Sequence, residues 1–280
     1  EYALERRQGR RANTLNGESA LIIEHPDVKR MLMTMKANIE AMRCLIYLNA
    51  KAIDTAHNHP DESEREKGKE LTDLLTPLSK GWCTDLGNEM TSLGIQIHGG
   101  MGFIEETGAA QHYRDIRIAG IYEGTNGIQA IDLVGRKLGM RNGEVVSELL
   151  SQIDETITTL TENGLQEIGD PLEEANESLK SASEWLLQNG GGSTDDGLSG
   201  ATPYLRMFGM TVGGWLLAKS AIKAQVLLDE NTGKGDFLNA KIETAKFFSQ
   251  QLLPQVNALL SSVTSGSSSL YAIDNETLRR

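Results

Sequence analysis

Two long runs of apolar residues with helical spacing constrain the fold of this chain more than any other feature. In residues 27–57, large apolar side chains recur at steps of four and three, which is a heptad-like repeat. They are Val28, Leu32, Met35, Ile39, Met42, Ile46 and Ile53. Residues 67–97 repeat the pattern with Leu71, Leu75, Leu78, Trp82, Leu86, Met90, Leu93 and Ile97. Two such helices, joined by the short polar segment 58–66, predict an antiparallel helical hairpin.

The rest of the chain also has helical spacing and shows no strand-like alternation of useful length, so we expect an all-α fold. The start of the chain and a helix at residues 125–138 are predicted to complete a four-helix bundle with the hairpin. The glycine-containing break at Leu138-Gly139-Met140-Arg141-Asn142-Gly143 is the predicted domain boundary. It separates the bundle domain, residues 1–140, from a second helical domain, residues 141–280.

The second domain is expected to hold four helical segments. They are residues 146–160, a helix that starts at Pro171, residues 203–229 and residues 236–263. The third segment is apolar on most sides up to Ala218, which predicts the buried centre of this domain. Gly209, Gly213 and Gly214 would allow close helix contacts there, and Pro254 is expected to bend the fourth segment.

Composition excludes several classes of function. The net charge is −12 and the isoelectric point is about 5.0, which argues against a nucleic-acid or anionic-membrane partner. The most apolar stretch, Met207 to Ala218, is too short to span a bilayer. Cys44 and Cys83 show no ligand spacing, so we expect reduced thiols, no metal site and a cytoplasmic protein, or a mitochondrial-matrix protein in a eukaryote. The chain opens at Glu1 inside a helical pattern, without a secretory signal, and is expected to be a piece of a longer protein.

One carboxylate lies on a predicted tight turn at the mouth of a helix. The segment is Ile121-Tyr122-Glu123-Gly124-Thr125-Asn126-Gly127-Ile128-Gln129. Gly124 and Gly127 allow a sharp bend, and Thr125 or Asn126 can cap the helix that follows. Loops held by rigid elements commonly carry catalytic groups, which makes Glu123 a candidate. A simple capped helix start with a solvated glutamate is the alternative interpretation of this segment alone.

A second glycine-rich segment precedes the first and changes this interpretation. It is Gln96-Ile97-His98-Gly99-Gly100-Met101-Gly102-Phe103, linked onward by Tyr113-Arg114-Asp115-Ile116-Arg117. In this order, the segments resemble the C-terminal signature of the flavin-dependent acyl-CoA dehydrogenases over about residues 1–140. The remainder resembles the extra helical domain of a longer-chain branch, whose members act on long or unusual acyl groups and include the methylthiopropanoyl-CoA dehydrogenases.

The resemblance implies an enzyme that oxidises acyl-CoA to 2-enoyl-CoA. Glu123 would be the base that removes the α-proton while a hydride passes from the β-carbon to FAD. Tyr122 and Gly124 would line the thioester end of the pocket. Thr125 and Asn126 would face the flavin.

The resemblance also implies a homodimer or homotetramer. The Gly99-Gly100 backbone, with Gln96 beside it, would lie against the adenosine part of the FAD of a partner subunit. Arg6, in a segment similar to the family's Tyr-Ala-x-x-Arg, would contact the flavin dinucleotide, since a guanidinium can pair two phosphate oxygens. The family passes its electrons to an electron-transfer flavoprotein.

Two interpretations from different classes remain. The family places an all-helical domain and a β-domain before the position of residue 1, so the chain is either the C-terminal portion of a working dehydrogenase or a stand-alone, non-catalytic helical assembly protein. The intact mass of the native protein, or the reading frame upstream of Glu1, would discriminate between them. Retention of Glu123 favours the enzyme, because packing alone does not require a carboxylate there. The residues do not fix the acyl group, and the 280-residue chain alone is expected to be inactive.

Overall fold

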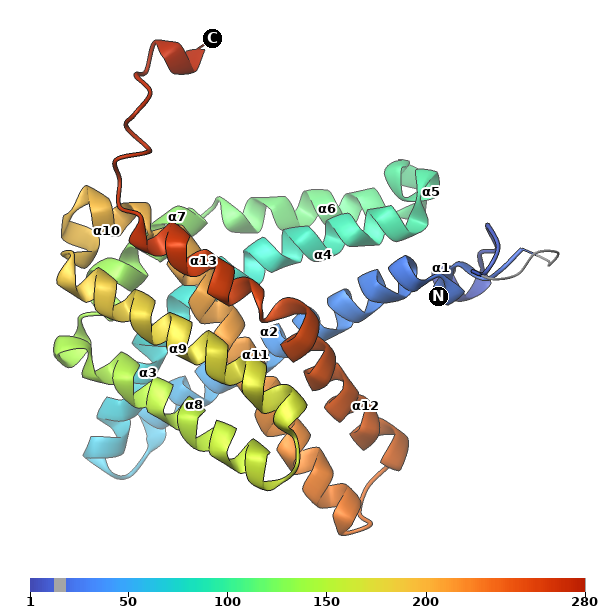
Figure 1. Cartoon of the computed structure of the whole chain (residues 1–280), viewed down its shortest axis with the longest axis horizontal. Coiled ribbons are helices and arrows are strands. Elements are labelled where there is room, and N and C mark those ends of the chain that lie inside the picture. The colour runs from blue at the N-terminus through green and yellow to red at the C-terminus, as the bar shows by residue number, and fades with distance from the viewer. Residues whose placement is uncertain (13–18, 280) are drawn as a thin grey trace.

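The computed structural model describes residues 1–12 and 19–279, and within them every regular element is a helix (Figure 1). The first half contains α1 (Tyr2–Glu5), α2 (Pro26–Asn58), α3 (Glu62–Pro77), α4 (Cys83–His98), α5 (Gly100–Phe103), α6 (Ala109–Arg117) and α7 (Asn126–Asp132). The second half contains α8 (Glu144–Glu162), α9 (Gln166–Gln188), α10 (Asp195–Ser199), α11 (Ala201–Asp229), α12 (Gly235–Phe247) and α13 (Gln255–Thr264). The predicted all-α class is confirmed.

The predicted hairpin is present, but its second helix is divided. α2 and α3 pack side by side, and α3 ends at Pro77, where a π-helical turn, Leu78–Trp82, leads into α4. The membership of the bundle also differs from the prediction. The start of the chain gives only the single turn α1, and the helix that lies along α4 is α6 (Figure 1). The close approach of α6 depends on Gly87, because a Cβ there would lie 2.9 Å from Ile116.

The apolar stripe of α2 contributes to the core only in part. Met42 and three residues near the start of the helix are partly buried and pack against core clusters. The other three residues of the stripe are 40%, 47% and 43% exposed, namely Ile39, Ile46 and Ile53. The buried face instead carries Ala37, Ala41 and Leu45. This face meets α11 so closely that a Cβ on Gly213 would lie 3.2 Å from the Ala41 methyl group. Small side chains permit that approach and large branched ones do not, so the isoleucines are left on the outer side.

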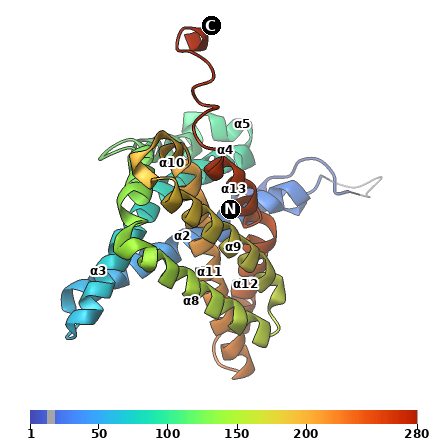
Figure 2. The same cartoon turned by 60° about the vertical axis from the view of Figure 1, so that its left-hand side comes forward.

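The central position of α11 is confirmed. Every residue from Met207 to Ala218 is buried, and Figure 2 shows α11 passing behind α8 and α9. The Trp82 ring packs on the glycines of α11, where a Cβ on Gly209 would meet it at 2.3 Å. One hydrophobic cluster therefore includes residues from both sides of residue 140. The domain boundary near residue 140 stays a prediction.

One predicted helix start in the second half differs from the structure, and one predicted break agrees with it. α9 begins at Gln166, earlier than predicted, and Pro171 lies inside the helix. The helix starts early because Ile168 already belongs to the fully buried face that continues at Leu172. Pro254 separates α12 and the π-helical turn Phe248–Leu252 from α13, as predicted.

Candidate functional site

Glu123 lies on a strained turn between α6 and α7. Its backbone has φ of 52° and that of Gly124 has φ of 86°, both in the left-handed region. A non-glycine residue in that region is held there only by its surroundings. Of the two predicted caps, Thr125 is the one that caps α7, because its hydroxyl accepts the Ile128 N–H at 3.4 Å. The side chains of Tyr122 and Glu123 are exposed, so the turn presents the carboxylate outward from a constrained backbone.

A hydrogen-bond network beneath the turn ties it to the junction of α3 and α4. The ammonium of Lys80 donates to the Gly124 carbonyl at 2.7 Å and to Asn126 Oδ1 at 2.8 Å. The Asn126 amide donates to the Gly81 carbonyl at 3.1 Å and to Asp85 Oδ1 at 2.6 Å. Asn126 is only 9% exposed, so its polar atoms are engaged within the protein. A contact of Asn126 with flavin stays a prediction.

The sequence reasoning missed Lys80, Thr84 and Asp85, which hold this turn from below. Thr84 Oγ1 accepts a further hydrogen bond from the Asn126 amide at 2.9 Å. The available signal was a patch of polar residues four and five positions apart, beside the apolar stripe of the second long helix. That pattern fits a solvated face equally well, and only the packing of α7 distinguishes the two.

Three of the residues predicted to contact flavin gather at the other end of α4. Arg6, Gln96 and Gly99 line a groove of about 390 Å³ between the start of the chain and α4. Gly99 has φ of 59° and ψ of −140°, a conformation suited to glycine. A Cβ on Gly99 or Gly100 would meet nothing within 4 Å, so open space faces this backbone. The site therefore offers an open backbone surface next to a guanidinium, which is suited to an anionic ligand with a planar group.

The two clusters of predicted residues do not meet in one chain. α4 has 16 residues and is therefore about 24 Å long. Figure 1 shows α1 and α5 near one end of this helix and α7 toward the other. One chain thus carries the turn with the Glu123 carboxylate at one end of α4 and, at the other end, a separate glycine surface formed by the backbone of Gly99 and Gly100.

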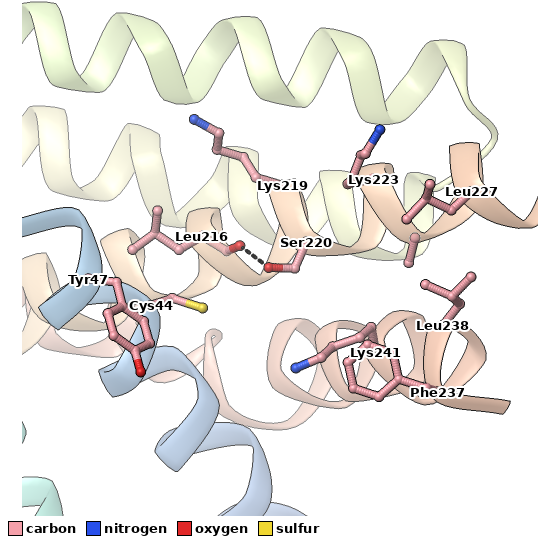
Figure 3. Close-up of a pocket in the computed structure, with 11 residues that line it drawn as sticks. Cys44, Tyr47, Leu216, Lys219, Ser220, Lys223, Leu227, Phe237, Leu238 and Lys241 are labelled. Carbon is pink, nitrogen blue, oxygen red and sulfur yellow. Dashed lines mark hydrogen bonds between the residues drawn. The ribbon is translucent and has the colours of Figure 1, made fainter. Parts of the chain in front are cut away.

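A larger groove of about 490 Å³ lies between α2, α11 and α12 and contains none of the predicted residues (Figure 3). Its lining is mostly apolar, with lysines among it. The ammonium of Lys241 pairs with Glu40 at 2.8 Å, and the Ser220 hydroxyl donates to the Leu216 carbonyl at 2.9 Å. The lining residues include no carboxylate and no histidine.

The buried cysteine and the possible metal ligands can be assessed from the described residues. Burial raises the pKa of the Cys83 thiol to about 12, which keeps it protonated near neutral pH. Among residues 1–12 and 19–279, no three histidine, cysteine or acidic side chains are grouped as ligands for a metal. In the same part of the chain, none of the helices has the length and apolar character needed to cross a bilayer.

Comparison with known proteins gives a consistent result along the chain. Residues 4–138 match the family model described as acyl-CoA dehydrogenase, C-terminal domain, and residues 149–274 match the model described as acetyl-CoA dehydrogenase C-terminal like. A 3-methylmercaptopropionyl-CoA dehydrogenase of Ruegeria pomeroyi is 40% identical over 271 residues, which cover 96% of this chain and 46% of that protein. The chain thus spans about half the length of this curated relative.

Two solved structures share the fold. An acyl-CoA dehydrogenase of Caenorhabditis elegans, ACDH-11, determined in complex with C11-CoA, superposes with a TM-score of 0.72 at 19% identity. The match covers 99% of this chain and 43% of that one. An acyl-CoA dehydrogenase of Bacillus anthracis, determined in complex with FAD, gives a TM-score of 0.68 at 18% identity, over 98% of this chain and 46% of that one.

Proposed function

The chain belongs to the acyl-CoA dehydrogenase family, and we propose that it is the C-terminal portion of an enzyme that oxidises acyl-CoA to 2-enoyl-CoA. The observation that carries the proposal is the placement of Glu123. Its carboxylate projects from a constrained, capped turn inside the segment that matches the family model. A positioned carboxylate is the group that removal of a weakly acidic α-proton requires.

Glu123 would act as the general base. One oxygen of its carboxylate takes the α-proton, and the electron pair of that C–H bond forms the new double bond as the hydride leaves the β-carbon. FAD, when bound, supplies the acceptor for that hydride. Tyr122 and Gly124 would line the thioester end of the pocket, where they exclude water from the reacting carbons.

The residues that would hold FAD fit such a group in part. The open backbone at Gly99 and Gly100 admits close approach of a planar ring system, and Arg6 can pair phosphate oxygens with its planar fork. Gln96 lines the same groove, and Thr125 lies at the turn some 24 Å away by the length of α4. This separation supports the proposal that one subunit contributes its glycine surface to the FAD of a partner in a homodimer or homotetramer.

The proposal also names the substrate class and the electron acceptor. Identity of 40% makes 3-methylmercaptopropionyl-CoA the first thioester to test. The C11-CoA and FAD complexes of the structural relatives support an acyl-CoA substrate and a flavin cofactor. An electron-transfer flavoprotein in the cytoplasm would receive the electrons, as the family resemblance implies.

Substitution Glu123→Gln in the complete, flavin-loaded enzyme tests the proposal. Glutamine keeps the shape of the side chain but cannot take the proton, and a general base typically contributes about 10²–10⁴-fold to the rate. We therefore expect turnover to fall by that factor while flavin content is unchanged. Glu173→Gln, at an exposed position on α9, is the matched control and should keep full activity. Wild-type turnover in Glu123→Gln would overturn the assignment.

A further inference from the structure

We propose that Lys80 is a positioning residue for Glu123, an inference that rests on the function proposed above. Lys80 lies in the π-helical turn between α3 and α4, far from Glu123 in sequence. Its ammonium donates one hydrogen bond to the Gly124 carbonyl at 2.7 Å and another to Asn126 Oδ1 at 2.8 Å. Gly124 directly follows Glu123, and Asn126 begins α7 three residues after it, so a single side chain fixes both the backbone next to the carboxylate and the start of the helix.

The turn needs an external restraint. Glu123 and Gly124 both have positive φ, and such a backbone persists at a non-glycine residue only when neighbouring structure enforces it. The backbone bonds nearest to the turn are Tyr122 N–H to the Ile118 carbonyl at 3.0 Å and Ile128 N–H to the Thr125 carbonyl at 2.9 Å. The Gly124 carbonyl lies between these anchors, and its partner is Lys80.

The charge of Lys80 is directed at the turn. Among residues 1–12 and 19–279, no carboxylate lies within ion-pair distance of its ammonium. The nearest acidic residue of the network, Asp85, instead accepts from the Asn126 amide at 2.6 Å. The hydrogen bonds of Lys80 to neutral oxygens are charge-assisted, which makes them stronger than bonds between neutral groups. Arginine could reproduce part of this arrangement, whereas methionine keeps an unbranched side chain only one atom shorter and removes every donor.

Loss of Lys80 should therefore affect the chemical step more than substrate binding. A displacement of a catalytic group by about 1 Å can cost on the order of 10²-fold in rate. For Lys80→Met in the complete, flavin-loaded enzyme, we expect kcat per bound flavin to fall about 10²-fold with KM nearly unchanged. Lys80→Arg should recover a substantial part of the loss. Lys69→Met, which removes an exposed lysine of α3, is the control and should keep wild-type kcat.

A purely structural role for Lys80 predicts a different pattern. It would lower thermal stability and flavin content but leave kcat per bound flavin unchanged, and that result would overturn the proposal. Glu123→Gln separates this failure from failure of the proposed function. If Glu123→Gln is fully active, the proposed function is wrong; if Glu123→Gln is inactive and Lys80→Met is fully active per flavin, only the positioning role is wrong.

The 280-residue chain offers a test that needs no catalysis. Lys80 holds the Gly124 carbonyl and the side-chain amide of Asn126. Without these two hydrogen bonds, the first turn of α7 should open more often. In Lys80→Met, we expect amide hydrogen exchange at Ile128 and Gln129 to become at least about tenfold faster, whereas Lys69→Met should leave both rates unchanged. Equal exchange in the two variants would contradict the restraint on the turn.

Discussion

At the residue scale, the contact between Gly209 and Trp82 makes the core intolerant of one added methyl group. A Cβ on Gly209 would lie 2.3 Å from the indole ring of Trp82, which is buried in the core. Alanine is favoured over glycine in a helix by about 1 kcal/mol, but overpacking a core costs about 1–3 kcal/mol. At this short distance the second effect should dominate, so Gly209→Ala should lower the free energy of unfolding by about 1–3 kcal/mol in a denaturant titration.

Gly94 provides the matched control for that substitution. It also lies inside a helix, α4, but a Cβ there would meet only the Met35 methyl group, at 4.0 Å. Gly94→Ala should therefore keep the helix-propensity gain and raise the free energy of unfolding by up to about 1 kcal/mol. Equal stability of the two variants would show that the indole ring yields to the added methyl group.

The sequence predicted single residues well where their chemistry is local. Gly124 and the Thr125 cap follow from the conformational freedom of glycine and from the hydroxyl of threonine, and both occupy the expected turn. Lys80 could not be found in this way, because its partners, Gly124 and Asn126, are more than forty positions away along the chain. From sequence alone, a lysine on a helix is predicted to be exposed to solvent, and only the packing of a neighbouring helix shows otherwise.

At the element scale, α2 shows why apolar periodicity identified the helix but misplaced part of its buried face. The large side chains at Ile39, Ile46 and Ile53 dominate any hydrophobic pattern, so the sequence predicts that they face inward. A close contact with α11 is instead made by Ala41, and Ala37 is buried one turn away; both contribute little to such a pattern. Close helix contacts select small residues for their volume, and a scale based on hydrophobicity does not register that selection.

An ion pair joins α2 to α12 and should make their contact sensitive to pH. Burial opposes ionisation of Glu40, but hydrogen bonds from Lys241 and Lys36 and their charges outweigh it, so the pKa of Glu40 is lowered from its ordinary 4.5. The charged form is thus favoured by folding. Its contribution is complete above the ordinary pKa and is lost as pH falls through the lowered value.

Glu40→Gln should therefore reduce stability at neutral pH and have little effect in acid. We expect the free energy of unfolding to fall by about 1 kcal/mol at pH 7, a value limited by solvent screening, and the difference from wild type to disappear as pH falls through the lowered pKa of Glu40. Glu276→Gln, which removes an exposed partner of Arg279, should change stability at neither pH. A difference that persists undiminished in acid would contradict the role of the Glu40 charge.

At the scale of the whole molecule, the chain's own surfaces should not retain FAD. A site for a ligand of this kind typically encloses about 70–90% of the ligand surface. Here the groove at Arg6 and Gly99 measures about 390 Å³, and the Thr125 turn lies at the far end of a helix about 24 Å long. After incubation with excess FAD and desalting, the purified chain should show no flavin absorbance and no turnover of acyl-CoA. A yellow, stoichiometrically loaded protein that reduces its flavin with acyl-CoA would contradict this expectation.

The same chain should nevertheless fold and self-associate. Its core is complete, since α11 is buried within the chain along Met207 to Ala218. Its outer surface, by contrast, still exposes apolar side chains. Ile39, Ile46 and Ile53 form an exposed seam at heptad spacing along the 33-residue helix α2. Seams of this kind pair with other helices. Replacing all three isoleucines with serine should lower the mass measured by light scattering toward that of a monomer. Leu187→Ser, at an isolated and similarly exposed position on α9, should leave the mass unchanged. If the triple variant keeps the wild-type mass, association occurs through another surface, and the α2 seam has no part in it.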